Sequence, residues 1–382
     1  MKYITTLLLF FILQNSYAQV TFLVEKLPEN TPENATIYIS GDFEGWTGGQ
    51  EPYKLSKNKN TYFITLPKQS TTIHFKFTQG SWNSVETDLE GNDLNNRTYT
   101  YTSKTDTVKA EILNWANTTI KKSTATENVS VLSEKFYIPQ LDRNRKIWIY
   151  LPPGYDESDK HYPVMYMHDG QNLFDSSLSF SGEWEVDETL NKLYQEKGMA
   201  MIVIGIDNGG NKRLDEYSPW KNEKYGGGEG EAYVDFIVND LKPYVDKNYK
   251  TIANKNQTAI MGSSMGGLIS YYAALKAPDV FGKIGVFSPA FWFSNESFTY
   301  AKTNGNIKDT KMYLLAGDKE GEKVAIDEIN QTVKGINDMV KILKQEGFTP
   351  DNITTKVVPD GLHNEKMWRE NFEEAVLWLF DQ

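Results

Sequence analysis

The sequence contains no cysteine among its 382 residues. That absence excludes a disulfide framework, a thiolate metal site, a cysteine nucleophile and a lipid anchor attached through cysteine. Long apolar runs are also scarce: only residues 4–13 form one, and a bilayer-spanning helix needs about 20 residues. Excess positive charge is missing too, because 40 basic and 51 acidic residues leave a net charge of −11. Nucleic acids and anionic membrane surfaces are therefore not expected partners.

The beginning of the chain has the pattern of an export signal. Lys2 precedes the apolar run 4–13, and Ser16-Tyr17-Ala18 follows it as a small-x-small cleavage pattern. We expect residues 1–18 to be a signal peptide that is cleaved after Ala18. The mature chain would then be periplasmic or extracellular, with no membrane insertion after cleavage.

Residues 19–115 alternate apolar and polar side chains in short runs that are separated by turn residues. Alternation with a period of two is typical of antiparallel strands with one face in water. The pattern predicts a small all-β sandwich. The polar residues 116–133 have too few apolar side chains for a core and are predicted to be a linker.

From residue 134 to residue 382 the pattern changes to apolar strands that alternate with helices. Such alternation implies a mostly parallel sheet with helices on both faces. The predicted strands are 146–151, 164–168, 201–206, 257–261, 283–287, 311–315 and 353–358. The predicted helices are 186–195, 232–245, 267–276, 324–345 and 368–380.

A candidate nucleophile lies between a predicted strand and a predicted helix. Residues 262–266 read Gly-Ser-Ser-Met-Gly, which is the Gly-x-Ser-x-Gly pattern of a nucleophile elbow. In such a sharp turn the two glycines avoid collisions with neighbouring backbone. The turn exposes the hydroxyl of Ser264 and directs the backbone N–H of Met265 towards a developing oxyanion.

A serine nucleophile needs a base, and the chain has only four histidines. His74 lies in the predicted β-sandwich, and His161 lies in a polar turn. His168 ends a predicted strand but precedes the nucleophile. His363 follows the last predicted strand, which fits the chain order of serine, acid and histidine, so we predict that His363 is the base.

The acid should follow a strand between the nucleophile and the base. The predicted strand 311–315 is followed by three carboxylates, and either Asp or Glu can orient the histidine. We take Glu320 as the first candidate, with Asp318 and Glu322 as alternatives. The second oxyanion donor is expected from the loop after strand 164–168, as the backbone N–H of Gly170 or of Gln171.

Several motifs together resemble the esterase D-like family of α/β hydrolases, which includes feruloyl, acetyl xylan and enterochelin esterases. The resemblance spans roughly residues 134–382. It implies ester hydrolysis without a metal or an organic cofactor, supports an acid three residues after Gly317, and implies that Trp292 and Tyr217 contact the substrate. The matching motifs are Lys146–Tyr155, Tyr162–Val164, His168–Gly170, Glu216–Pro219, Gly262–Gly267, Ser288–Trp292 and Gly361–His363.

The N-terminal region is similar to the immunoglobulin-like modules that precede glycogen-debranching enzymes. The similarity lies in residues 39–46 and 74–77. Some of these modules bind carbohydrate, so Trp46 and Trp82 are candidates for a sugar platform. The alternative is that both tryptophans are structural residues of the module.

Together these features predict an exported serine esterase that cleaves acetyl or feruloyl esters on plant or algal carbohydrate. One alternative is a hydrolase of siderophore triesters, whose anionic ligand would meet a basic cluster. The second alternative is a secreted carbohydrate-binding protein without activity. The candidate basic cluster comprises Lys212, Arg213, Lys221 and Lys224.

Overall fold

A computed structural model describes residues 19–68, 72–89, 91, 93–102, 105–116, 123–179, 182–307, 309–321 and 330–380. The predicted signal peptide lies outside these residues. The chain divides into two units, Met1–Thr119 and Ile120–Gln382, so the division falls inside the predicted linker. Within the described residues, no helix is both long and apolar enough to cross a membrane.

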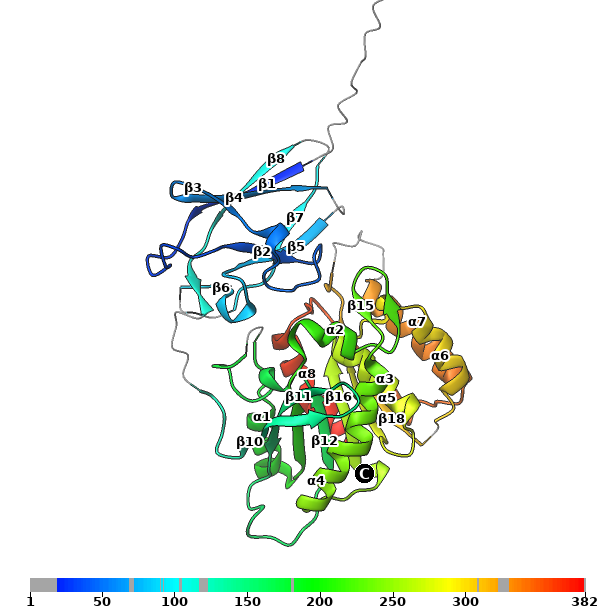
Figure 1. Cartoon of the computed structure of the whole chain (residues 1–382). Coiled ribbons are helices and arrows are strands. Elements are labelled where there is room, and N and C mark those ends of the chain that lie inside the picture. The colour runs from blue at the N-terminus through cyan, green and yellow to red at the C-terminus, as the bar shows by residue number, and fades with distance from the viewer. Residues whose placement is uncertain are drawn as a thin grey trace, which may run out of the picture. The chain divides into compact units, whose positions relative to one another are not determined.

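The N-terminal unit contains three small sheets around a shared apolar core (Figure 1). One sheet has the order β3-β4-β1-β8, the second has the order β2-β5-β7, and β6 pairs with β9. The predicted alternation is seen in β1, where Val20, Phe22 and Val24 are fully buried. The strands are β1 (Gln19–Lys26), β2 (Tyr38–Gly41), β3 (Ser56–Asn58), β4 (Thr61–Pro67), β5 (Thr72–Thr78), β6 (Glu86–Thr87), β7 (Arg97–Thr100), β8 (Asp106–Glu111) and β9 (Asn114–Trp115).

The C-terminal unit is built on an eight-stranded sheet of order β10-β11-β13-β12-β16-β17-β18-β19. The pairs β10/β11 and β11/β13 are antiparallel, and every later pair is parallel. The strands are β10 (Val129–Ile138), β11 (Arg143–Tyr150), β12 (Val164–His168), β13 (Ile202–Ile206), β16 (Thr258–Ser263), β17 (Lys283–Phe287), β18 (Lys311–Gly317) and β19 (Ile353–Val358). The predicted α/β-hydrolase fold class is confirmed.

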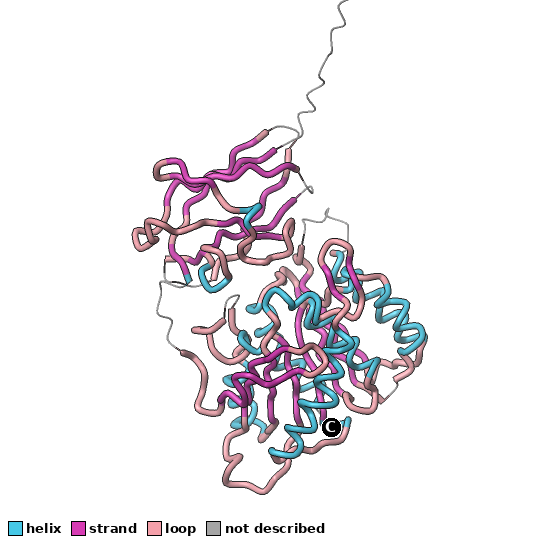
Figure 2. The backbone as a smooth tube through the Cα atoms, viewed as in Figure 1, coloured by secondary structure: helices cyan, strands magenta, loops and turns pink. Residues whose placement is uncertain are grey.

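Helices cover both faces of this sheet (Figure 2). In β12 the side chains alternate between two cores: Val164 and Tyr166 pack into one, Met165 and Met167 into the other. The second core also contains α1 and α8. The helices are α1 (Val186–Lys197), α2 (Arg213–Glu216), α3 (Gly230–Phe236), α4 (Lys242–Asn248), α5 (Met265–Lys276), α6 (Glu296–Asn304), α7 (Gln331–Gln345) and α8 (Glu365–Phe380).

Three predicted elements differ from the structure. β10 begins at Val129, so the last residues of the predicted linker form an edge strand that pairs with β11. The predicted helix 232–245 is α3 and α4 joined by a π-helical turn at Ile237–Leu241. The described part of the predicted helix 324–345 is α7, and residues 324–329 lie outside the described residues.

Candidate active site

Ser264 stands at the turn from β16 into α5 with φ 58° and ψ −120°. A positive φ is strained for a residue with a side chain, and such strain is typical of functional turns. A side chain at Gly262 would meet the backbone of Gly266 at 2.8 Å and the His168 ring at 2.9 Å. The strained conformation is held by the Ser264 N–H, which donates to the carbonyl of Phe287 at 2.9 Å.

The loops after β18 and β19 bring Glu320 and His363 together. His363 Nδ1 lies 3.0 Å from Glu320 Oε2. The other carboxylate oxygen accepts from the Gly317 N–H at 2.7 Å and from the Ser288 hydroxyl at 2.5 Å. Burial alone would raise the pKa of Glu320, but the contact with His363 and these two hydrogen bonds outweigh it and lower that pKa. Glu320 is therefore an ionised, buried carboxylate that fixes one nitrogen of the His363 imidazole.

The other two candidate acids do not share this arrangement. Asp318 Oδ1 is buried without a hydrogen-bond partner. Its backbone N–H donates to Val358 O, which belongs to the pairing of β18 with β19. Glu322 lies outside the described residues. Among the described carboxylates, only Glu320 contacts the His363 imidazole.

Two residues that the sequence reasoning did not assign support this pair. Ser288, with φ 44°, donates to Glu320 and accepts from Trp368 Nε1 at 2.8 Å. The Trp368 ring also meets the His363 ring edge-on, with centroids 5.1 Å apart. The sequence signal was present in the Ser-Pro motif that starts at Ser288, but its partner Trp368 lies 80 residues away.

The candidate nucleophile Ser264 and the candidate base His363 are linked through this network and have no direct hydrogen bond in the described part of the chain. Ser264 bonds to the end of β17 at Phe287, the next residue Ser288 bonds to Glu320, and Glu320 bonds to His363. Catalytic hydrogen bonds are often long in ligand-free structures and tighten when substrate binds. The carboxyl ends of the parallel strands thus bring all three groups to one edge of the sheet.

The predicted oxyanion loop follows β12 and is fixed by ionic contacts. A side chain at Gly170 would meet backbone atoms of β13 and of Asp207 at 2.9 Å, so only glycine fits here. The preceding Asp169 has φ 57° and accepts two hydrogen bonds from Arg213, at 2.7 and 2.8 Å. The side chain of Gln171 accepts from the Asn208 N–H at 3.1 Å. The loop carrying both candidate donors is thereby tied to the segment after β13.

His168 and Tyr217 lie beneath this loop and are both buried. Burial lowers the pKa of His168 to about 3, so its ring is neutral, and its Nδ1 lies 2.9 Å from the Tyr233 hydroxyl. A neutral, enclosed ring does not fit a general base. Tyr217 is fully buried, and its hydroxyl accepts from the Asp169 N–H at 3.2 Å. This burial does not fit the predicted substrate contact of Tyr217, because the side chain supports the loop from within.

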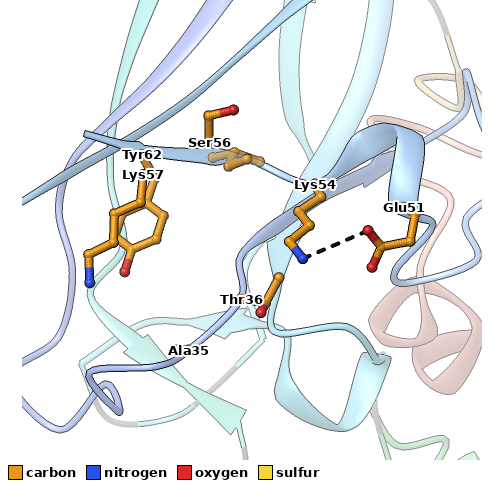
Figure 3. Close-up of a pocket in the computed structure, with 8 residues that line it drawn as sticks. Ala35, Thr36, Glu51, Lys54, Ser56, Lys57 and Tyr62 are labelled. Carbon is orange, nitrogen blue, oxygen red and sulfur yellow. Dashed lines mark ion pairs between the residues drawn. The ribbon is translucent and has the colours of Figure 1, made fainter. Parts of the chain in front are cut away.

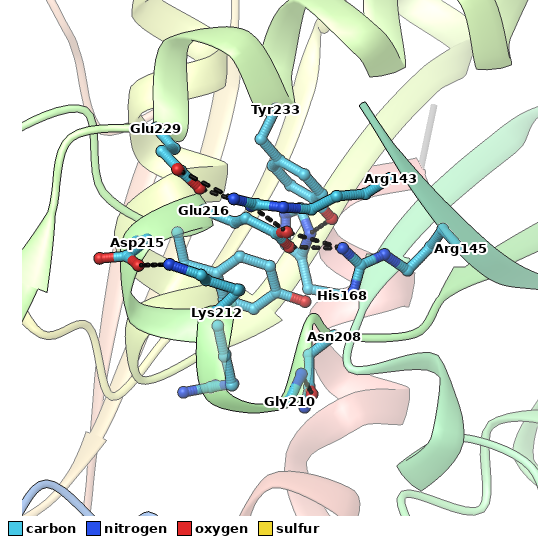
Figure 4. A network of polar contacts seen from close by, with 12 residues as sticks. Arg143, Arg145, His168, Asn208, Gly210, Lys212, Asp215, Glu216, Glu229 and Tyr233 are labelled. Atoms are coloured by element: carbon cyan, nitrogen blue, oxygen red, sulfur yellow. Dashed lines mark hydrogen bonds and ion pairs between the residues drawn. The ribbon is translucent and has the colours of Figure 1, made fainter. Parts of the chain in front are cut away.

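A network of charges fixes the segment that follows β13 (Figure 4). Arg143 and Arg145 converge on Glu216, which is fully buried, and Arg143 also pairs with Glu229. Of the candidate basic cluster, Lys212 pairs with Asp215 at 3.0 Å, and Arg213 pairs with Asp169 as described above. Two of the four cations are therefore neutralised within the protein. Lys221 and Lys224 are exposed.

Trp292 is 56% exposed, on the short turn Phe291–Phe293 that follows β17. Its ring packs edge-on against Tyr225, with centroids 5.7 Å apart. Ala290, two residues before Trp292, donates its N–H to the carbonyl of Ser264 at 3.1 Å. The turn that carries the exposed ring is therefore tied directly to the nucleophile.

In the N-terminal unit, Trp46 and Trp82 lie together. Their ring centroids are 5.9 Å apart at an interplanar angle of 36°, and Trp82 Nε1 donates to the Trp46 carbonyl at 2.8 Å. Both are half-buried, and sugar binding by this pair stays a prediction.

The same unit has an open hollow of about 450 Å³ (Figure 3). It is lined by Ala35, Thr36, Glu51, Lys54, Leu55, Ser56, Lys57 and Tyr62.

Comparisons with known proteins find a matching family, related sequences and similar folds. The family model described as "Putative esterase" matches residues 138–379. The uncharacterized protein YbbA of Bacillus subtilis is 30% identical over 62% of this chain and 93% of its own length. An endo-1,4-beta-xylanase/feruloyl esterase of Xylanibacter ruminicola is 26% identical over 61% of this chain but only 29% of its own length. The enterobactin esterase FES of Shigella flexneri shares the fold, with a TM-score of 0.54, 13% identity, and coverage of 90% of this chain and 88% of that chain.

Proposed function

Because this chain belongs to the esterase family whose model spans residues 138–379, we propose that it hydrolyses esters by a serine mechanism. In this mechanism Ser264 is the nucleophile, His363 is the general base and Glu320 is the acid that orients it. The observation that supports the proposal most is the strained backbone of Ser264, because a glycine-flanked turn between β16 and α5 exposes the hydroxyl.

The first chemical step is attack of Ser264 Oγ on the ester carbonyl carbon. With Nδ1 bonded to Glu320, the His363 imidazole has Nε2 available to take the serine proton. The buried carboxylate then stabilises the imidazolium that forms. The backbone N–H of Met265, together with that of Gly170 or Gln171, donates to the oxygen that becomes negatively charged.

The second step breaks the ester bond and leaves an acyl group on Ser264. The leaving alcohol takes the proton from the His363 imidazolium, so charge balances at the end of acylation. Water then attacks the acyl carbonyl while His363 accepts its proton, and the carboxylic acid leaves as that proton returns to Ser264. Apart from the substrate, water is the one reactant that this sequence of proton transfers takes from outside the chain.

For the substrate, we propose an acetyl or feruloyl ester of a plant or algal carbohydrate. The exposed Trp292 beside the nucleophile turn offers an aromatic face on which a sugar or phenolic ring could stack. The similarity to the Xylanibacter ruminicola xylanase/feruloyl esterase supports the same class. We also propose that the protein is exported after cleavage behind Ala18, and N-terminal sequencing of the mature protein should then begin at Gln19.

A siderophore triester is the second candidate, and one observation favours it. The likeness to the Shigella flexneri enterobactin esterase covers 90% of this chain, which extends beyond the C-terminal unit into the N-terminal one. The pairing of Lys212 and Arg213 with carboxylates speaks against it, because a trianionic ligand would need unpaired cations.

The mechanism is tested by comparing the purified protein with its Ser264→Ala variant on p-nitrophenyl acetate and methyl ferulate at pH 7–8. Loss of a triad member should lower kcat by several orders of magnitude while leaving the melting temperature close to that of the parent. Ser263→Ala is a matched control, because it removes the adjacent hydroxyl outside the elbow centre. Equal losses in both variants, or none in Ser264→Ala, would refute the assignment.

The substrate class is tested by comparing kcat/KM for feruloylated oligosaccharide with that for ferric enterobactin. Trp292→Ala should raise KM for the carbohydrate ester and leave hydrolysis of p-nitrophenyl acetate unchanged, because the small ester does not reach the ring. Preferred turnover of the siderophore would replace the carbohydrate proposal without affecting the serine mechanism. Detection of binding to insoluble xylan with no turnover of any ester would instead favour the non-catalytic alternative.

A further inference from the structure

Three carboxylates meet at the start of α1, away from the residues assigned to catalysis. Glu183, Asp187 and Glu188 each place one oxygen within 4.8 Å of the others. Glu183 and Asp187 are 4% and 0% exposed. Charged groups of one sign are rarely buried together, because desolvation and mutual repulsion both oppose ionisation.

The hydrogen bonds around these carboxylates leave two buried oxygens unsatisfied. The hydroxyl of Thr124 donates to both oxygens of Glu183 at 2.9 Å, and the Thr126 N–H donates to Asp187 Oδ2 at 2.8 Å. Asp187 Oδ1 and Glu188 Oε2 are buried with no N–H or O–H donor from another residue, and they can bond to each other only when one of the two carboxyls carries a proton. A fully buried carboxylate oxygen with no donor, beside two further carboxylates, is costly unless a positive group faces it.

No such positive group comes from the described part of the chain. Lysine and arginine form no ion pair there with Glu183, Asp187 or Glu188, and the nearby Arg369 pairs with Glu185 at 2.9 Å.

We propose that Glu183, Asp187 and Glu188 bind one hard divalent cation, with Ca²⁺ as the best fit. Two oxygens on opposite sides of one Ca²⁺ are about 4.6–5.2 Å apart, so atoms within 4.8 Å of one another can share the ion. The donors are all oxygens, which Ca²⁺ prefers, whereas zinc sites favour the nitrogen and sulfur ligands that are missing here. Three close carboxylates suit Ca²⁺, which accepts six to eight oxygens in a flexible geometry, better than Mg²⁺, which needs a near-ideal octahedron and loses its waters reluctantly.

The bound ion would hold two distant segments together. Thr124 and Thr126 lie just before β10 and donate hydrogen bonds to Glu183 and Asp187 at the start of α1. These ligands therefore connect the segment before β10 to α1. Trp184, next to Glu183, packs on Phe287 and Trp368 with ring centroids 5.3 and 5.8 Å apart. The ion would therefore stabilise the unit and the packing behind the catalytic residues, without touching the reacting atoms.

The test uses the full-length mature protein after treatment with EDTA and removal of the chelator. Isothermal titration with CaCl₂ should show one site, and thermal unfolding should shift upward by about 5 °C at one hundred times the Kd. MgCl₂ should bind more weakly. Asp187→Asn and Glu188→Gln should each lower the Ca²⁺ affinity at least tenfold, while Glu157→Gln, an exposed acid outside the cluster, should bind as the parent does.

The competing explanation is that Asp187 and Glu188 share a proton and bind no ion. In that case neither CaCl₂ nor MgCl₂ at 10 mM would shift the melting temperature, titration would give no heat beyond that of diluting the same salt into buffer, and the proposal would be overturned. Because titration on the unsubstituted protein decides the question, poor folding of a variant does not leave it open. The result is independent of ester hydrolysis, which needs none of these residues.

Discussion

Replacing Glu320 by Gln removes the negative charge beside His363 while keeping the shape of the side chain. Glu320 Oε2 lies 3.0 Å from His363 Nδ1, and its carboxylate is stabilised by the Gly317 N–H and the Ser288 hydroxyl. The amide of Gln can present its NH₂ group to Nδ1, which would favour the wrong tautomer of the imidazole. The nucleophile would then lack an acceptor for its proton.

The size of the effect follows from charge and distance. Two unit charges 4 Å apart at an effective dielectric constant of about 20 interact by about 4 kcal/mol. The His363 side chain is 38% exposed, and screening by water reduces the stabilisation of the imidazolium to about 2–3 kcal/mol, or a factor of roughly 30–150 in rate. The wrong tautomer can raise the total towards about 10⁴-fold. We therefore expect kcat to fall by about 10² to 10⁴.

The assay is hydrolysis of p-nitrophenyl acetate by Glu320→Gln, Asp318→Asn and Glu322→Gln, each with a melting temperature measured in parallel. The other two substitutions each remove one carboxylate within two residues of Glu320 in the sequence and should change kcat less than threefold. A larger loss in Asp318→Asn or Glu322→Gln than in Glu320→Gln would refute the assignment of the acid. A loss below tenfold in Glu320→Gln would refute the electrostatic argument itself.

Three further changes follow from contacts in the C-terminal unit. Gly262→Ala should abolish activity and lower the melting temperature, because its side chain would meet backbone at 2.8 Å. Gly335→Ala, which would meet only side-chain atoms of Phe291 at 3.6 Å or more, should instead gain about 0.5–1 kcal/mol of helix stability. Arg213→Met should leave Asp169 without its bidentate partner and disturb the oxyanion loop. Steady-state kinetics should then show a lower kcat with little change in KM. The raised pKa of Glu183, about 7, means that this group binds more protons in the folded than in the unfolded state above pH 4.5, so its contribution to stability should fall as pH rises from 5 to 8. In EDTA, the urea stability of the parent relative to Glu183→Gln should therefore fall over this range, and a constant or rising difference would contradict this sign.

The local pattern of apolar and polar residues predicted much of the fold. The strands 164–168 and 283–287 coincide with β12 and β17, because buried parallel strands are short apolar runs between turn residues. The strand 353–358 coincides with β19, an edge strand in which only Ile353 is buried. The four-residue helix α2 and the π-helical turn after α3 were missed. Neither has a periodicity of its own, since packing against the sheet and the ion pairs of Glu216 set them.

The sequence likewise identifies only some of the residues of the candidate site. Ser264 and His363 are each identifiable from the chain, because a glycine-flanked turn and the order of strands leave few choices. The choice among the carboxylates after β18 depends on which one points back towards His363, and that direction is decided by the fold. Tyr217 was predicted to contact the substrate, but its side chain is fully buried. A short sequence motif does not show whether a side chain points into the protein or towards the site.

By itself the sequence determined the two-part organisation, the order of strands and helices, and the choice of Ser264 as candidate nucleophile, since each depends on residues close together in the chain. Only the tertiary structure decided which groups bond to Glu320 and that Arg213 pairs with Asp169. It also decided that Glu183, Asp187 and Glu188 lie together beside the segment that precedes β10. The physical reason is that hydrogen bonds, ion pairs and desolvation act over a few ångströms in space. Sequence spacing does not measure that distance once the chain has crossed from one strand of the sheet to another.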